Sequence, residues 1–309
     1  MKRLAFFSIS ALSASIASLD EDKDRTVAHL ALLKTVDRAK LSPAEQSNYD
    51  AVLFTLSGEA AAGKRYAYGY EGAGQPYVVS QLTGAYQDIP DFLGSQHTIE
   101  TKADADAYLE RLVAFGVVMD QESDRVRRDV NLGVTPPDFI LERALGQMRG
   151  LKTEPAASPL VTSLTERVKA KGIAGNYGPA AECAVSAYVY PALDRQIALL
   201  DGLRARAKAD AGVWALPDGE AYYRDALRNF TTTDLTPKQV HQMGLDQARE
   251  LGARAEAILA KQGMTKGTVG ERIAALSKTY PLTPQSPTTM GASVLMRRRS
   301  RGRCRWSTG

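Results

Sequence analysis

The sequence predicts an all-α fold, a multi-helix array followed by a disordered basic C-terminal tail. Three observations support this prediction. The helix-start pattern Ser/Thr-Pro recurs along the chain, apolar residues recur at spacings of three and four, and no stretch alternates polar and apolar residues long enough to form a sheet. With 309 residues, of which 44% are hydrophobic, the chain can bury a core as one large domain or two smaller ones.

Several helices are expected to begin at capping sequences. A Ser or Thr side chain caps a helix by accepting a backbone N–H bond, and Pro favours the first helical position. Ser42 to Glu45 and Thr236 to Gln239 are full capping boxes with Pro at the first position. Looser versions occur at 135–138 and 158–159, and Thr268 with Glu271 caps one more helix, which is interrupted at Tyr280.

Apolar residues at helical spacing predict the buried face of three of these helices. The first set is Tyr108, Leu112, Phe115 and Met119. The second set is Val189, Leu193, Ile197 and Leu200. The third, in a helix over 236–262 that ends at Gly263, is Val240, Ala248, Leu251, Ala255 and Ile258.

One long irregular region is expected, over residues 63–76. It holds four glycines and three tyrosines, and long loops in compact domains are often functional or disordered. Its Gly69–Gly74 stretch lacks the preceding strand and the Lys-Ser/Thr ending of a phosphate-binding loop, so we interpret it as a flexible loop. The following residues, Tyr77 to Ser80, are expected to form a short strand or an extended loop.

Composition divides the chain into three parts. Residues 281–309 hold six arginines and no Asp, Glu or Lys, so they carry +6 against +4 for the whole chain and are predicted to be disordered or non-native. Residues 41–280 are near neutral and form the predicted helical part. Residues 1–40 are an N-terminal segment, in which 1–17 have the order of a secretory signal peptide weakened by serines.

The N-terminus leaves two compartments open. A cleaved signal at 1–17 implies a periplasmic or secreted protein, and a poorly structured N-terminus implies a cytoplasmic one. No apolar run approaches the roughly 20 residues that a transmembrane helix needs. Only Cys183 and Cys304 are present, which excludes a disulfide framework and a cysteine-based zinc site.

Candidate catalytic residues are few. None of the three histidines, His29, His97 and His241, lies in an H-E-x-x-H arrangement. His97 and Glu100 could share a helix face as metal ligands, but polar residues at a helix start normally cap and solvate it. His241 is expected at or near the surface and His29 at the edge of a core. With no G-x-S-x-G motif, we predict no catalytic and no metal-binding residue in this chain.

Several segments together resemble the bacterial "domain of unknown function 885" family over about residues 41–277. The matching segments are Pro76–Tyr86, Pro90–Leu93, Gln96–Glu100, Asp104–Leu109, Pro136–Leu141, Tyr190–Leu193, Leu216–Tyr223 and Thr231–Pro237 with His241. The resemblance implies a longer, largely helical zinc-metallopeptidase-like protein. Its C-terminal half would carry an H-E-x-x-P-G-H helix that binds zinc and hydrolyses a peptide substrate.

The H-E-x-x-P-G-H motif is absent here, so we expect no cofactor in this chain. The leading hypothesis is a truncated, incomplete helical array that is inactive alone, with residues after Tyr280 translated out of frame or left by a comparable truncation. The alternative is a stand-alone helical interaction module whose basic tail binds acidic partners, although a disordered tail disfavours a nucleic-acid partner.

If part of this chain contacts substrate, we expect it around the non-helical stretch near residue 80. Aromatic and amide side chains there can line a groove, and packing between helices is an equally good explanation for them. The candidate groove residues are Tyr77, Gln81, Tyr86 and His97.

Overall fold

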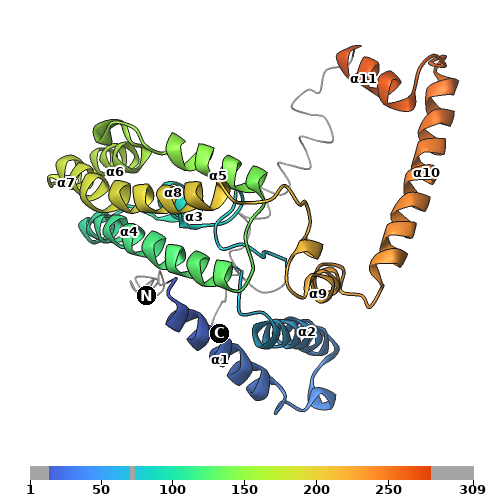
Figure 1. Ribbon diagram of the computed structural model, residues 1–309, viewed down its shortest axis with the longest axis horizontal. Coiled ribbons are helices and arrows are strands. Elements are labelled where there is room, and N and C mark those ends of the chain that lie inside the picture. The colour runs from blue at the N-terminus through green and yellow to red at the C-terminus, as the bar shows by residue number, and fades with distance from the viewer. Residues whose placement is uncertain (1–13, 70–73, 280–309) are drawn as a thin grey trace, which may run out of the picture. The chain divides into compact units, whose positions relative to one another are not determined.

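The computed structural model describes residues 14–69 and 74–279, which consist of helices and loops without a strand (Figure 1). This confirms the predicted all-α fold. The predicted tail at 281–309 and most of the predicted signal at 1–17 lie outside the described residues. The α-helices are α1 (Ile16–Leu33), α2 (Pro43–Arg65), α3 (Ala85–Asp91), α4 (Lys102–Asn131), α5 (Asp138–Gly150), α6 (Pro159–Ala170), α7 (Tyr177–Ala184), α8 (Tyr190–Arg204), α9 (Gly219–Thr231), α10 (Pro237–Lys261) and α11 (Val269–Thr279).

The chain divides into two compact units after Asp234. In the first unit α4, the longest helix, packs against α8, and α8 packs against α5 (Figure 1). Two π-helical segments, η3 (Phe92–Gln96) and η5 (Val185–Val189), continue α3 and join α7 to α8. In the part of the chain that the structure describes, no helix is both long and apolar enough to cross a membrane.

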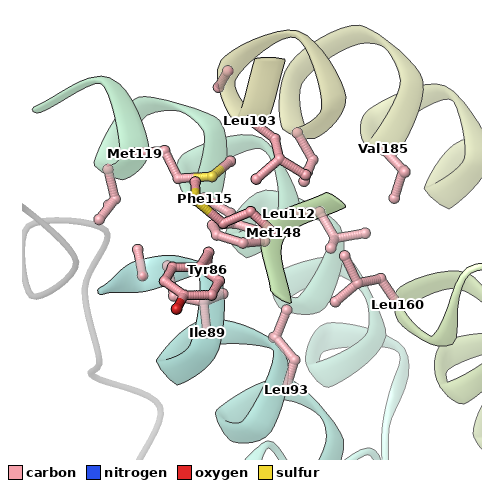
Figure 2. Packing of buried hydrophobic residues seen from close by; sticks show 14 of the residues in the cluster. Tyr86, Ile89, Leu93, Leu112, Phe115, Met119, Met148, Leu160, Val185 and Leu193 are labelled. Carbon is pink, nitrogen blue, oxygen red and sulfur yellow. The ribbon is translucent and has the colours of Figure 1, made fainter. Parts of the chain in front are cut away.

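The core of the first unit forms where α3, α4, α5, α6 and α8 meet (Figure 2). All four residues of the predicted α4 stripe, from Tyr108 to Met119, are fully buried, which confirms the first apolar set. The second set is confirmed as well, with Ile197 partly buried and the other three members buried. Figure 2 shows Tyr86, Ile89 and Leu93 of α3 and η3 pointing into this core.

Four of the five predicted helix starts are confirmed in their local hydrogen bonds. The Ser42 and Thr236 capping boxes are complete, Ser158 caps α6, and Thr268 and Glu271 bond reciprocally at the start of α11. These caps satisfy N–H groups that a helix cannot bond internally. At α5 the cap is Pro137, without a side-chain bond.

Two predictions in the first unit are wrong. The irregular region begins at Tyr66 and not at residue 63, because α2 continues through Gly63 to Arg65. His29 does not pack at a core edge: it is exposed, because α1 packs mainly on α2 and none of its residues is buried.

The predicted buried face of α10 is also wrong. Leu251 and Ile258 are each 58% exposed, and the buried apolar residue of this helix is Leu259. The predicted end at Gly263 is confirmed, with a positive φ of 77°. Helical spacing identifies one apolar stripe, but α11 covers only a short part of α10, and this decides which residues are buried.

Candidate functional site

The apolar stripe of α4 changes into a polar stripe in its last three turns. Glu122, Arg125 and Asp129 follow Met119 at helical spacing, and each is at most 4% exposed. Buried charged groups are rare because they lose hydration and must be compensated by partners. The sequence analysis missed these residues, although acidic and basic residues that continue an apolar stripe are a signal that could have found them.

Two of these side chains hold Gly69, the last described residue before residues 70–73. Asp129 Oδ2 accepts the Gly69 N–H at 2.9 Å, and Arg125 Nη2 donates to the Gly69 carbonyl oxygen at 2.8 Å. Gly69 has a φ of +94°, and a β-carbon there would lie 2.7 Å from the Gln75 carbonyl oxygen. Glycine is therefore required at this close approach of two loop segments.

An aromatic cluster holds the far side of the same loop. Tyr222 of α9 packs edge-on against Tyr66, with ring centroids 5.0 Å apart, and stacks with Tyr68. The Tyr222 hydroxyl accepts the Gly74 N–H at 2.8 Å, and the Tyr66 hydroxyl donates to Asp225 at 2.7 Å. The loop is therefore attached to α4 at Gly69 and to α9 at Gly74.

We call Tyr77 to Tyr86 the anchored segment: it is an extended loop up to Gly84, and its last two residues begin α3. Thr83 Oγ1 donates to the Tyr77 carbonyl oxygen at 3.1 Å, and Ser80 N donates to the Thr83 carbonyl oxygen at 3.1 Å. The Tyr86 hydroxyl lies 2.7 Å from both the Ser80 carbonyl oxygen and Gln147 Oε1. Polar groups of the segment and of α5 thus hold a loop backbone that has no repeating pattern of backbone hydrogen bonds.

Three of the predicted groove residues lie in the anchored segment, in different environments. Tyr86 is fully buried, and burial raises its pKa to about 12, so its hydroxyl stays neutral. Tyr77 is half-buried, and burial raises the pKa of its hydroxyl as well. Gln81 is half-buried, and its Oε1 is a buried acceptor without a partner among the described residues. The adjacent Leu82 is 77% exposed.

His97 lies outside the anchored segment, at the end of η3. Its ring is buried; Nε2 donates to the Asp104 carbonyl oxygen at 2.9 Å, and Arg111 Nη1 donates to Nδ1 at 2.5 Å. Burial lowers the pKa of His97, and the charges of Arg111 and Arg167 lower it further. Both ring nitrogens are therefore engaged in the neutral state, which makes this ring a structural element.

The surface beside His97 is an open groove of about 380 Å³. Glu100, the other candidate ligand, pairs there with Lys171 at 2.5 Å. Across residues 14–69 and 74–279, no group of three or more His, Cys, Asp or Glu side chains is placed to hold a metal ion. His241 and Cys183 are both exposed.

Removing the Tyr86 hydroxyl is expected to loosen the anchored segment. Tyr86→Phe leaves the Ser80 carbonyl oxygen and the side chains of Gln147 and Gln87 without this partner, which lowers the free energy of unfolding by about 1–2 kcal/mol. Urea denaturation measures the change. Tyr188→Phe is the control, because Tyr188 is half exposed, and an equal effect of both variants would contradict the role assigned to Tyr86.

Comparison with known families gives a match over most of the chain. The sequence model of the family described as "Bacterial protein of unknown function (DUF885)" matches residues 11–298. The chain belongs to the DUF885 family. The match extends beyond both ends of the region 41–277 on which the resemblance rests, and it includes residues 281–298 of the segment predicted to be a non-native tail.

A solved structure has the same fold as the DUF885 chain. It is titled the "putative lipoprotein from Colwellia psychrerythraea", is 24% identical in sequence and superposes with a TM-score of 0.81. The match covers 93% of this chain and 50% of that chain, so the DUF885 chain spans about half the length of this relative. No curated protein matches the chain.

Proposed function

We propose that this chain forms the helical scaffold and part of the substrate-facing surface of a metallopeptidase-like protein, and that it has no peptidase activity by itself. Peptides are the proposed substrates of longer family members that carry the H-E-x-x-P-G-H helix. Within this chain, the anchored segment is the proposed contact with peptide.

The observation that carries this proposal is the way in which the anchored segment is held. The segment is attached to α5 through the hydroxyl of Tyr86, which contacts Gln147. It is attached to α4 through Glu122, whose side-chain Oε1 accepts the Ala85 N–H at 2.8 Å. A loop held rigidly on a scaffold is a common position for binding residues. The exposed Leu82 is its proposed apolar contact for a peptide, and the half-buried Gln81 lies directly before it in the segment.

The residues of this chain do not fit a catalytic zinc. Such a site needs three protein ligands and an open position for water. The sequence has no H-E-x-x-P-G-H segment, and both nitrogens of His97 are engaged by Asp104 and Arg111. We therefore assign no catalytic step to any residue described here.

Metal content and peptidase activity test the proposal together. The purified chain is expected to bind less than stoichiometric zinc by inductively coupled plasma mass spectrometry, and to cleave no peptide from a mixed-sequence pool in a chelator-sensitive way. A longer DUF885 protein that carries H-E-x-x-P-G-H is the positive control. Stoichiometric zinc or chelator-sensitive cleavage by this chain would overturn the proposal.

The contact with peptide has its own test. A mixed-sequence pool of short peptides with a photoreactive residue is expected to crosslink to the anchored segment, and Gln81→Ala with Leu82→Ala is expected to reduce the yield. Replacing Gln87, which lies in α3 beside the segment, with alanine gives no suitable control, because Gln87 bonds to Tyr86. Gln242→Ala in exposed α10 is the control, and crosslinks distributed without preference for the segment would contradict the assignment.

A further inference from the structure

Glu122 is a buried carboxyl group at the junction of α3, α4 and α8. It is 2% exposed and lies on α4. Its Oε1 accepts the N–H of Ala85, the first residue of α3, at 2.8 Å, and its Oε2 lies 3.4 Å from Gln196 Nε2 of α8. One side chain thus connects the end of the anchored segment to two core helices.

This carboxyl group forms no ion pair in the part of the chain that the structure describes. Among those residues, no Lys, Arg or His lies within salt-bridge distance of Glu122. From its own helix it faces Arg125, which donates to the Gly69 carbonyl oxygen. From α3 it faces the carboxylate of Asp88 and the neutral hydroxyl of Tyr86, and from α8 the uncharged amide of Gln196.

Gln196 gives an ionised Glu122 only weak compensation for its burial, because the contact between them is long. Gln196 is fully buried, its Nε2 also donates to the Met119 carbonyl oxygen at 3.1 Å, and its Oε1 has no partner among the described residues. A carboxylate would therefore receive one short and one long neutral hydrogen bond in a buried site. Burial raises the pKa of Glu122 to about 7, from an ordinary value of 4.5.

We propose that Glu122 is a proton-sensitive clamp, which holds the anchored segment on α4 and α8 when its carboxyl group is neutral and holds it less firmly when the group is ionised. The inference goes beyond the proposed function, because it concerns this carboxyl group and stands whether or not the segment binds peptides. It gives the segment a conformational response to pH between mildly acidic and neutral conditions.

The direction of the pH effect follows from proton linkage. In an opened state Glu122 is hydrated and loses its proton near its ordinary pKa of 4.5, whereas the closed state keeps the proton up to a pH of about 7. The clamp is therefore strongest below pH 4.5 and weakens as the pH rises to about 7. Above that pH both states are ionised, and the weakening reaches a plateau.

Hydrogen exchange at the Ala85 amide reports the clamp directly, because this N–H bonds to Glu122. With rates corrected for intrinsic exchange, the opening constant at Ala85 is expected to rise by up to about tenfold per pH unit, and by about 40-fold from about pH 5 to about pH 7. Glu122→Gln keeps an acceptor for Ala85 and removes the titrating proton, so its opening constant is expected to stay level across this range.

The matched control is Glu110→Gln, an exposed glutamate on the same helix, which is expected to keep the wild-type profile. A wild-type opening constant that does not change with pH would overturn the proposal, as would a wild-type profile in the E122Q variant. If E122Q does not fold, the pH profiles of the opening constant in the wild type and E110Q test the proposal. A rise of the opening constant that ends in a plateau near neutral pH supports the clamp, and a rise without a plateau contradicts it.

Discussion

Gly116→Ala is expected to lower the free energy of unfolding by about 2 kcal/mol, although alanine is the better helix former. Gly116 lies in the middle of α4, where η5 crosses it. A β-carbon at this position would lie 2.5 Å from the Tyr188 carbonyl oxygen and 3.0 Å from the carbonyl carbon. Backbone atoms cannot rotate away as a side chain can, so α4 and η5 must move apart. The cost of this overpacking, about 3 kcal/mol, outweighs the gain of about 1 kcal/mol from the higher helix propensity of alanine.

Gly146→Ala is the matched control for this prediction. Gly146 is an exposed residue inside α5, and a β-carbon there would meet no atom within 4 Å. The same substitution is therefore expected to raise the free energy of unfolding by about 0.5–1 kcal/mol. Urea denaturation followed by circular dichroism measures both variants. If both substitutions changed the free energy of unfolding in the same direction, the close approach at Gly116 would not be the reason that glycine is necessary there.

The second large effect is expected at Asp129. Asp129→Ala removes the acceptor of the Gly69 N–H and the partner of Arg128, and it takes away a negative charge close to the buried Arg125. Breaking a buried charged contact of this kind costs about 3 kcal/mol. The expected result is a loss of that size in the free energy of unfolding, together with faster hydrogen exchange at the Gly69 amide.

Asp124→Ala gives the comparison for Asp129. Asp124 lies on the same helix, is 69% exposed in its side chain and pairs with Arg127 at the surface. Its loss is expected to change the free energy of unfolding by less than about 1 kcal/mol. A similar loss in both variants, or an unchanged Gly69 amide in Asp129→Ala, would contradict the role of Asp129 in holding the loop.

The predictions from sequence were best where the interaction is local. The capping boxes at Ser42 and Thr236 depend on residues three positions apart, so they are already complete in the amino-acid order. The α4 stripe from Tyr108 to Met119 is similar, because helical spacing alone places these side chains on one face. The stripe of α10 has the same kind of pattern, and there the prediction was wrong because its burial depends on a second element.

The candidate site was only partly predictable. Tyr77 and Gln81 lie in the predicted non-helical stretch, whereas Tyr86 lies in the first turn of α3 and is fully buried. His97 lies apart from them, at the end of η3. The groups that hold the segment, Glu122 and Gln147, lie 37 positions and 61 positions away from their partners. Contacts over such separations leave no periodic signal, so residue types and spacing do not identify them.

The sequence by itself determined that the chain is helical, where five of its helices begin and which face of α4 and α8 is apolar. It also determined that the chain carries no H-E-x-x-P-G-H motif. Only the tertiary structure decided that the apolar face of α4 continues into a buried polar stripe, and that this stripe holds Gly69 and Ala85. The physical reason is range: capping and periodicity act within a few residues, whereas the burial of a charge depends on what the rest of the chain places around it.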